Sequence, residues 1–290
     1  MNGEKILKLF GAFAALGTFG ALVWLENRRP LRRPVESKLV RTGRNLAVAG
    51  IAAVALHLAE HPVVEPLTKL VERKNLGLLK LVRLPCWLET VLAVLLLDYT
   101  LYVWHVLTHK IPFLWRFHVV HHIDLDLDAS TALRFHFGEL VVSVAWRAAQ
   151  IVVIGVSPFA FAAWQAFLFP SILFHHSNVE LPVELEKKLR NFVVTPRMHG
   201  IHHSIVHSET DSNWSSGLTV WDFLHKTLKT NVPQDEIIIG VPAYRESDEV
   251  ILTKILQLPF EEQRPTWTLP EARDFKIQIE SNNSELDKSH

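Results

Sequence analysis

The sequence is poor in the features that mark several common protein classes. Its single cysteine, Cys86, excludes an internal disulfide and any zinc site built from several cysteines. Its formal net charge is zero, so no basic field favours nucleic acid as a partner. It also lacks G-x-G-x-x-G, C-x-x-C and H-P-G-G segments. The sequence therefore predicts no dinucleotide-binding, dithiol or cytochrome b5-like module.

What the sequence does have is long apolar runs. Apolar residues make up 49% of the 290 residues. They gather at 9–25, 45–59, 84–107 and 140–174. The last run would span about 50 Å as one helix, too long for a bilayer, and Pro158 breaks it into a hairpin. The first lacks a small-x-small cleavage site, which favours a retained anchor over a signal peptide. These runs predict an all-α integral membrane protein with about four transmembrane helices, the last two a hairpin.

The charged loops predict which side each helix end faces. Residues 27–44 carry seven Lys and Arg, and short basic loops stay in the cytoplasm. Following the chain from there brings 105–122 and 175–207 to that same side. The segment 60–83, with five Lys and Arg, then lies on the opposite side, where we expect an amphipathic surface helix.

Histidine is over-represented, and its spacing is ordered. Twelve of the 16 histidines fall between His105 and His207, and H-x-x-H-H occurs twice, at 118–122 and 199–203. Upstream, one helical face carries Asp98, Tyr102, His105 and His109. Metal-bound histidines usually donate their other ring N–H to a partner, so we expect Asp98 to accept that hydrogen bond, directly or through Tyr102.

The number of imidazoles predicts two metal ions in one histidine-rich pocket. Eight to ten imidazoles exceed what one ion can take, and unpaired buried imidazoles are costly. Ligand chemistry alone allows Fe, Zn, Cu or Ni. Because no carboxylate-rich ligand set appears, the site differs from that of the soluble di-iron bundles.

The order of these motifs resembles that of a known family. H-x-x-x-H, H-x-x-H-H, H-x-N and a second H-x-x-H-H are similar to those of the fatty acid hydroxylase/sterol desaturase superfamily, which are integral-membrane di-iron oxygenases. The flanks "LWRFHVVHH", "FHHSNVELP", "VTPRMHGIHHS" and "TDSNWSSGLTVWDFLHKT" resemble its bacterial members. The resemblance covers about 84–227. It implies membrane helices below a cytosolic helical cap rich in histidine, with the metal site between them.

The resemblance also assigns residues. The implied metal ligands are His105, His109, His118, His121, His122, His176, His199, His202 and His203, with His175 as an alternative to His176. Residues expected to support the ligands or line the site are Asp98, Tyr102, His136, Glu139, Asn178, His207, Asp211, Asn213 and Asp222. His136 and Glu139 have a structural ion pair as their alternative role. We expect no role at the metal site for four histidines: His57, His61, His225 and His290.

The function implied is O2-dependent hydroxylation or desaturation of a lipid C–H bond at two Fe ions. The isolated protein could carry Zn in place of Fe. Sterols, fatty-acyl chains and alkylglycerols are not separable as substrates. The electron donor is an external ferredoxin, cytochrome or flavin reductase. The alternative is a zinc-containing membrane hydrolase or a non-catalytic lipid-binding protein. A metal transporter is disfavoured, because transport sites sit near the bilayer midplane.

The expected organisation has three parts: anchor helices and loops at 1–83, a catalytic domain at 84–264 and a polar tail at 265–290. The similarity of the motif flanks to bacterial family members favours a bacterial inner membrane over the endoplasmic reticulum. We expect the metal site to face the cytoplasm.

Overall fold

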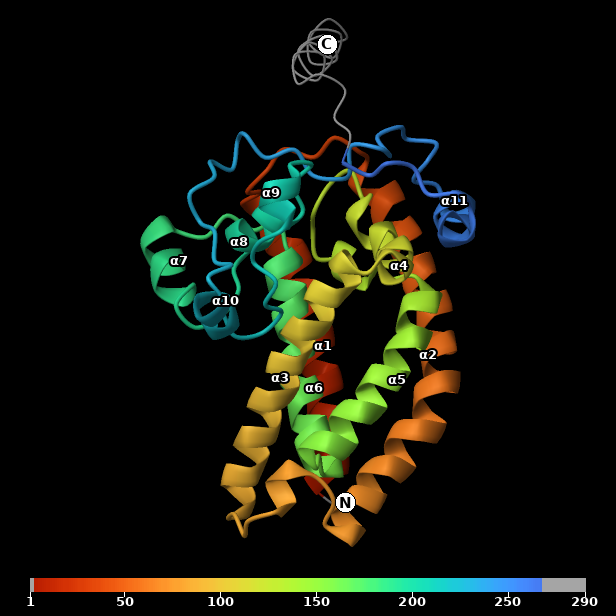
Figure 1. Cartoon of the computed structure of the whole chain (residues 1–290). Coiled ribbons are helices and arrows are strands. Elements are labelled where there is room, and N and C mark those ends of the chain that lie inside the picture. Colours follow the sequence, from red (N-terminus) through yellow and green to blue (C-terminus); the bar gives the residue numbers. More distant parts are fainter. Residues whose placement is uncertain (1–2, 268–290) are drawn as a thin grey trace, which may run out of the picture.

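The structure is a computed structural model that describes residues 3–267. Within that range the regular elements are helices, joined by loops with a few isolated bridges. The long helices are α1 (Gly3–Arg28), α2 (Lys38–Lys74), α3 (Cys86–Lys110), α5 (Phe137–Ile154) and α6 (Pro158–His176). Figure 1 shows them as one bundle, with the shorter helices gathered at one end. The tail predicted at 265–290 lies mostly outside the described residues, as does His290.

The shorter helices complete the cap. They are α4 (Pro112–His122), α7 (Val183–Leu189), α8 (Pro196–His202), α9 (His207–Thr210), α10 (Val220–His225) and α11 (Leu252–Gln257), with 3-10 turns η2 (Thr131–Leu133) and η3 (Leu258–Phe260). A further 3-10 turn, η1 (Leu78–Lys80), packs against α3 and α5 at the opposite end of the bundle (Figure 1).

All five long helices are long and apolar enough to cross a membrane. Their outward faces are apolar as well, and on α1 Phe13 and Leu16 are 72% and 71% exposed. In water such faces would be costly, whereas in lipid they meet a matching solvent. The predicted all-helical membrane fold is confirmed, and the approximate count of four helices becomes five candidate spans.

The predicted break at Pro158 is confirmed, and the local sequence explains it. α5 ends at Ile154, and Gly155 follows with φ of 89°, a left-handed conformation that glycine adopts without strain. The Ser157 side chain then accepts a hydrogen bond from the Ala160 amide, and Pro158 opens α6. The two helices therefore form the expected hairpin.

The expectation for the second run was wrong in its extent. We expected a helix over the apolar run 45–59 and a separate surface helix within 60–83, but α2 runs without interruption to Lys74, with Pro62 and Pro66 inside it. The chain then turns through Asn75, which has φ of 51°. α2 packs along α5, and this packing holds it as one helix despite the two prolines.

The bundle pairs α1 with α6 and α2 with α5, and α3 packs on α6. One apolar core between them includes Leu97, Ile151 and Trp164, each fully buried. This packing fixes the relative heights of the C-terminal ends of α3 and α6, which carry four of the predicted ligands.

Candidate metal centre

Both H-x-x-H-H motifs meet at the cap end of the bundle, as predicted. The first lies on α4, and the second lies on α8 and the residue after it. The His122 and His203 rings are stacked with centroids 4.3 Å apart, although 81 residues separate them. The last turns of α3 and α6 bring the remaining predicted ligands to the same place.

The imidazoles sort into two groups whose nitrogen atoms lie within 4.8 Å of one another. The first group is His105, His109, His122 and His202. The second group is His121, His176, His199 and His203. Each group takes ligands from both H-x-x-H-H motifs, so each copy of the motif contributes histidines to both sites. The neutral imidazole nitrogen is a ligand that suits both Zn and Fe.

The second group has Nε2 atoms that converge. His176 Nε2 lies 3.0 Å from His121 Nε2 and 3.0 Å from His199 Nε2. His203 Nε2 lies 3.1 Å from His199 Nε2. Nitrogen atoms that surround one ion at roughly 2.0–2.1 Å have about this spacing. The arrangement therefore fits a shared metal ion.

Backbone carbonyls set the orientation of several rings. The Nδ1–H groups of His105 and His202 donate to the carbonyls of Trp214 and Ser212, at 2.7 and 2.8 Å. In the second group His176 Nδ1–H donates to the Ile172 carbonyl at 2.8 Å. Each donation leaves the Nε2 lone pair of that ring free to face its group, which is the arrangement that metal-bound histidines require.

Burial keeps the cap histidines neutral. Burial lowers the pKa of His202 to about 3, even though its hydrogen bond to Ser212 raises it. Burial, reinforced by the neighbouring imidazoles, lowers the pKa values of His121, His122, His199 and His203 well below the ordinary value. Both ring nitrogens of His122 and the Nε2 atoms of His109 and His202 are buried without a hydrogen-bond partner. Such atoms are costly unless something binds them, so the groups fit metal ions.

His118 and His175 lie beside the two groups rather than in them. The His118 ring is 4.8 Å from that of His109, and its Nδ1–H donates to Glu139 Oε1 at 2.8 Å while its Nε2 has no partner. The His175 ring is 4.1 Å from that of His199. Glu139 thus accepts a hydrogen bond from a predicted ligand.

Asp98 does not do what the helical face suggested. Its Oδ2 accepts hydrogen bonds from the Leu218 amide at 3.0 Å and from Trp221 Nε1 at 2.7 Å, and it binds no histidine. Tyr102 bonds to Thr227 Oγ1 at 3.1 Å. The expected path from Asp98 through Tyr102 to a ligand is therefore absent, since His105 turns its Nδ1 toward the Trp214 carbonyl instead.

Asp222 and Asn213 do support the centre, one step away from it. Asp222 accepts from the amides of Trp214 and Ser215 at 2.9 and 3.0 Å, which fixes the carbonyl that orients His105. Burial raises the pKa of Asp222. Asn213 has φ of 52°, and its side-chain amide donates to the Met198 carbonyl at 2.9 Å, next to His199 in α8.

The remaining predicted residues do not contact the two groups. His136 caps α5 by accepting from the Gly138 amide at 3.0 Å. Asn178 donates to the Arg32 carbonyl at 2.8 Å. His207 stacks on the Trp267 ring and lies 3.4 Å from Asp211, which also pairs with Lys110 at 2.6 Å near the surface.

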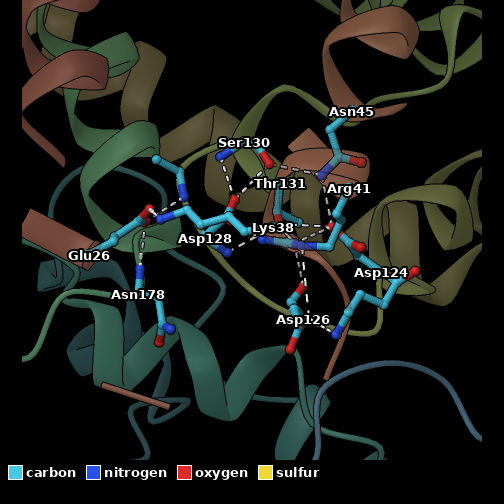
Figure 2. A network of polar contacts seen from close by, with 12 residues as sticks. Glu26, Lys38, Arg41, Asn45, Asp124, Asp126, Asp128, Ser130, Thr131 and Asn178 are labelled. Atoms are coloured by element: carbon cyan, nitrogen blue, oxygen red, sulfur yellow. Dashed lines mark hydrogen bonds and ion pairs between the residues drawn. The ribbon is translucent and has the colours of Figure 1, made fainter. Parts of the chain in front are cut away.

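A buried ionic network next to the centre escaped the sequence prediction. Asp124, Asp126 and Asp128 follow the first H-x-x-H-H directly, and Arg41 of α2 forms ion pairs with all three (Figure 2). Glu26 of α1 accepts from the amides of Ala129 and Asn178, both at 2.8 Å. The network ties the loops that leave α4 and α6 to the first two helices. Two features of the sequence could have predicted this network: the D-x-D-x-D spacing at 124–128 and the distant basic segment 28–44.

Arg32 fills the space that Gly200 leaves open inside the second motif. It donates to the Pro196 carbonyl at 2.8 Å and to Gln234 at 2.9 Å. A Cβ at Gly200 would collide with its guanidinium group. The glycine of "HGIHH" therefore lets α8 lie against the basic loop.

Comparison with known proteins gives one family and a set of lipid-modifying relatives. Residues 90–227 match the family described as fatty acid hydroxylase. The chain is 30% identical over 161 residues to ornithine lipid hydroxylase OlsE of Rhizobium tropici, covering 54% of this chain and 46% of that one. It is 29% identical over 146 residues to human cholesterol 25-hydroxylase, covering 48% and 50%.

Human alkylglycerol monooxygenase is 24% identical over 155 residues, covering 53% of this chain and 33% of that one. The chain thus spans half or less of the length of these curated relatives. No solved structure matches it.

Proposed function

The chain belongs to the fatty acid hydroxylase family through residues 90–227, and on that premise we propose that it is a membrane-bound oxidoreductase that hydroxylates a lipid C–H bond with O2. The balanced reaction converts R–H, O2, two electrons and two protons into R–OH and water. The observation that carries the proposal is the pair of four-histidine groups, buried at one end of an apolar bundle.

The nine histidines predicted as ligands, with His175 beside them, are the residues we propose to hold two iron ions. Bound there, iron would supply the oxidation of an unactivated C–H bond by O2. The chain keeps the imidazoles neutral by burial, and the carbonyls of Trp214, Ser212 and Ile172 turn the ring nitrogens inward. Because the groups lie where α3 and α6 end, a lipid chain in the bilayer can reach the site while its polar head stays at the surface.

The proposed substrate is a membrane lipid with a saturated aliphatic stretch. This chemistry is common to the ornithine lipids, sterols and alkylglycerols named by the relatives. The electrons come from a separate donor, a ferredoxin, cytochrome or flavin reductase, because the sequence carries none of the motifs that would hold one.

We place the site on the cytoplasmic face of a bacterial inner membrane. α1 ends at Arg28, at the end of the bundle that holds the histidine groups, because Glu26 accepts a hydrogen bond there from the Asn178 amide. The basic segment 28–44 therefore lies at that end. Short basic segments favour the cytoplasmic side. The relative from Rhizobium supports a bacterial membrane.

The test is oxygen consumption by protein purified in detergent from iron-supplemented cells, with a chemical reductant and a panel of lipids. Lipid-dependent consumption that yields a hydroxylated product is expected. His121→Ala and His202→Ala should abolish it and lower the bound metal, because each removes a ligand from one group, while membrane insertion stays intact. His61→Ala is the matched control, since His61 belongs to neither group and pairs with Glu65 on α2.

Full metal content in both ligand variants would refute the ligand assignment. Full metal content in wild-type protein without lipid-dependent oxygen use on any lipid of the panel would favour the zinc hydrolase or the lipid-binding protein.

A further inference from the structure

The cap carries an exposed apolar surface beside α3. Phe192, Val220, Phe223 and Leu224 are 70%, 45%, 49% and 64% exposed. We call these four residues the apolar ledge. Four large apolar side chains at this exposure would be a liability in water, and grouped exposed apolar residues mark a surface that something covers.

The four residues belong to one structural unit. The amide of Thr219 donates to the Phe192 carbonyl at 3.1 Å, and the amide of Val194 donates to the Gly217 carbonyl at 3.3 Å. Val193 and Leu218 form an antiparallel bridge between them. The segment that holds Phe192 therefore runs alongside the segment that opens α10, which carries the other three residues.

The ledge is fixed to the membrane-spanning part of α3. Asp98 Oδ2 accepts from Trp221 Nε1 at 2.7 Å and from the Leu218 amide at 3.0 Å. The Tyr99 ring lies 5.0 Å from that of Trp221, and Tyr102 stacks on His225 at 5.0 Å. α10 is thus attached to α3 at residues 98–102, and Figure 1 shows it beside the upper part of α3 rather than on top of the cap.

The position of Asp98 along α3 indicates how deep the apolar ledge lies in a membrane. Asp98 precedes His105 by seven residues, about 10 Å along a helix, on the side away from the cap. A hydrocarbon core of about 30 Å takes about 20 residues, so a span that starts at Cys86 extends to about His105. Residues 98–102 therefore lie inside that span, and the ledge beside them is at the same depth.

Polar backbone at such a depth needs partners, and here it has them. Asp98 takes the Leu218 amide and the Trp221 indole, and the amides of Thr219 and Val194 are bonded as described. Non-helical backbone is tolerated at membrane depth where its polar groups are satisfied within the protein.

We propose that the apolar ledge is immersed in the bilayer that α3 crosses, at the boundary between head groups and acyl chains. The ledge then fixes the cap at a constant height beside α3, close to the histidine groups. This inference does not depend on the metal or on catalysis.

The test uses a single reporter on the ledge. In a Cys86→Ser background, which removes the only cysteine, Leu224→Cys is labelled with an environment-sensitive fluorophore. The protein is reconstituted in phosphatidylcholine/phosphatidylglycerol vesicles, with or without bromine atoms on the acyl chains. Val206→Cys is the matched control, an apolar residue 38% exposed next to α9 at the top of the cap.

The expected result is quenching of the Leu224 label by brominated lipid and none of the Val206 label. Water-like emission without quenching at position 224 would overturn the proposal. So would an unquenched, blue-shifted label together with cross-linking between Leu224→Cys chains, because a second copy would then cover the ledge.

Discussion

At the scale of single residues, the centre depends on what each imidazole does with its second nitrogen. The rings of His105, His202 and His176 donate to the backbone carbonyls of Trp214, Ser212 and Ile172. His118 instead donates to a carboxylate, that of Glu139, whose other oxygen is buried without a partner among residues 3–267. A buried carboxylate that accepts a hydrogen bond from an imidazole fixes the orientation of that ring, so Glu139 is the side chain whose support of the centre is best tested.

Replacing Glu139 should weaken metal retention without removing a ligand. Glu139→Leu deletes the acceptor for His118 Nδ1–H and should lower metal affinity about 10- to 100-fold, measured by competition with a chelator and metal analysis. Glu139→Gln keeps an acceptor oxygen and should lose less.

The control for this substitution is Glu184→Leu, because Glu184 is exposed and pairs with Lys187 at the surface. Equal retention of metal by Glu139→Leu and Glu184→Leu would show that the pair with His118 is structural only.

The sequence predicted the identity of the histidines better than their partners. Spacing places His105 and His109 on one face whatever the rest of the fold does, because helical geometry is local. The acceptor for His105 is the carbonyl of Trp214, more than a hundred residues away, and its position depends on a loop held by Asp222. Asp98 was assigned to a ligand because it shares that face, but the loop at 217–221 approaches α3 there and takes its carboxylate.

At the scale of elements, the ionic network around Arg41 positions two of the histidine helices. Its three aspartates lie in the loop after α4, and Asp124 also accepts from Asn45 and Thr131. Burial alone would raise the pKa of Asp124, but the charges of Arg41 and Arg134 lower it below the ordinary value. The aspartate is therefore ionised in the folded protein.

Arg41→Met should destabilise the fold strongly, because it removes the cation that the buried Asp124, Asp126 and Asp128 share. A loss of about 3–5 kcal/mol is typical of breaking a buried pair from one side. The measurement is the thermal unfolding midpoint in detergent. Arg33→Met is the control, since Arg33 belongs to the same basic segment, 28–44, but is exposed. Equal midpoints for the two variants would contradict the role of the network.

The same network predicts the direction of acid sensitivity. The pKa of Asp124 is lower in the folded than in the unfolded chain, so its contribution is fully present above the ordinary aspartate pKa of about 4. That contribution is lost as the pH falls further, through the lower pKa of the folded state. Asp124→Asn should lack this part of the pH dependence in unfolding midpoints measured below about pH 5. An unchanged acid limb would contradict it.

Elements were predictable from the sequence where local rules decide them. The break at Pro158 follows from glycine, serine and proline in succession, and the hairpin formed there. α2 was expected to end early, but contacts with α5 carry it through Pro62 and Pro66, and such tertiary contacts are not visible in a single sequence. The cap loops were missed for the same reason, because their paths depend on the network and on Arg32.

At the scale of the whole molecule, one arrangement explains the doubled motif. α4 and α8 lie at the same end of a bundle whose outer faces suit lipid, and each provides ligands to both groups. One H-x-x-H-H would leave each group incomplete, because His122 and His202 serve the first group while His121, His199 and His203 serve the second. Two metal ions per chain are thus the central claim.

The measurement that tests this claim most directly is elemental analysis of the folded, detergent-purified chain from iron-supplemented cells. About two metal ions per chain are expected, as iron or as zinc taken up in its place, one for each group of four imidazoles. One ion per chain, or none, in protein that remains folded would contradict the two-site centre.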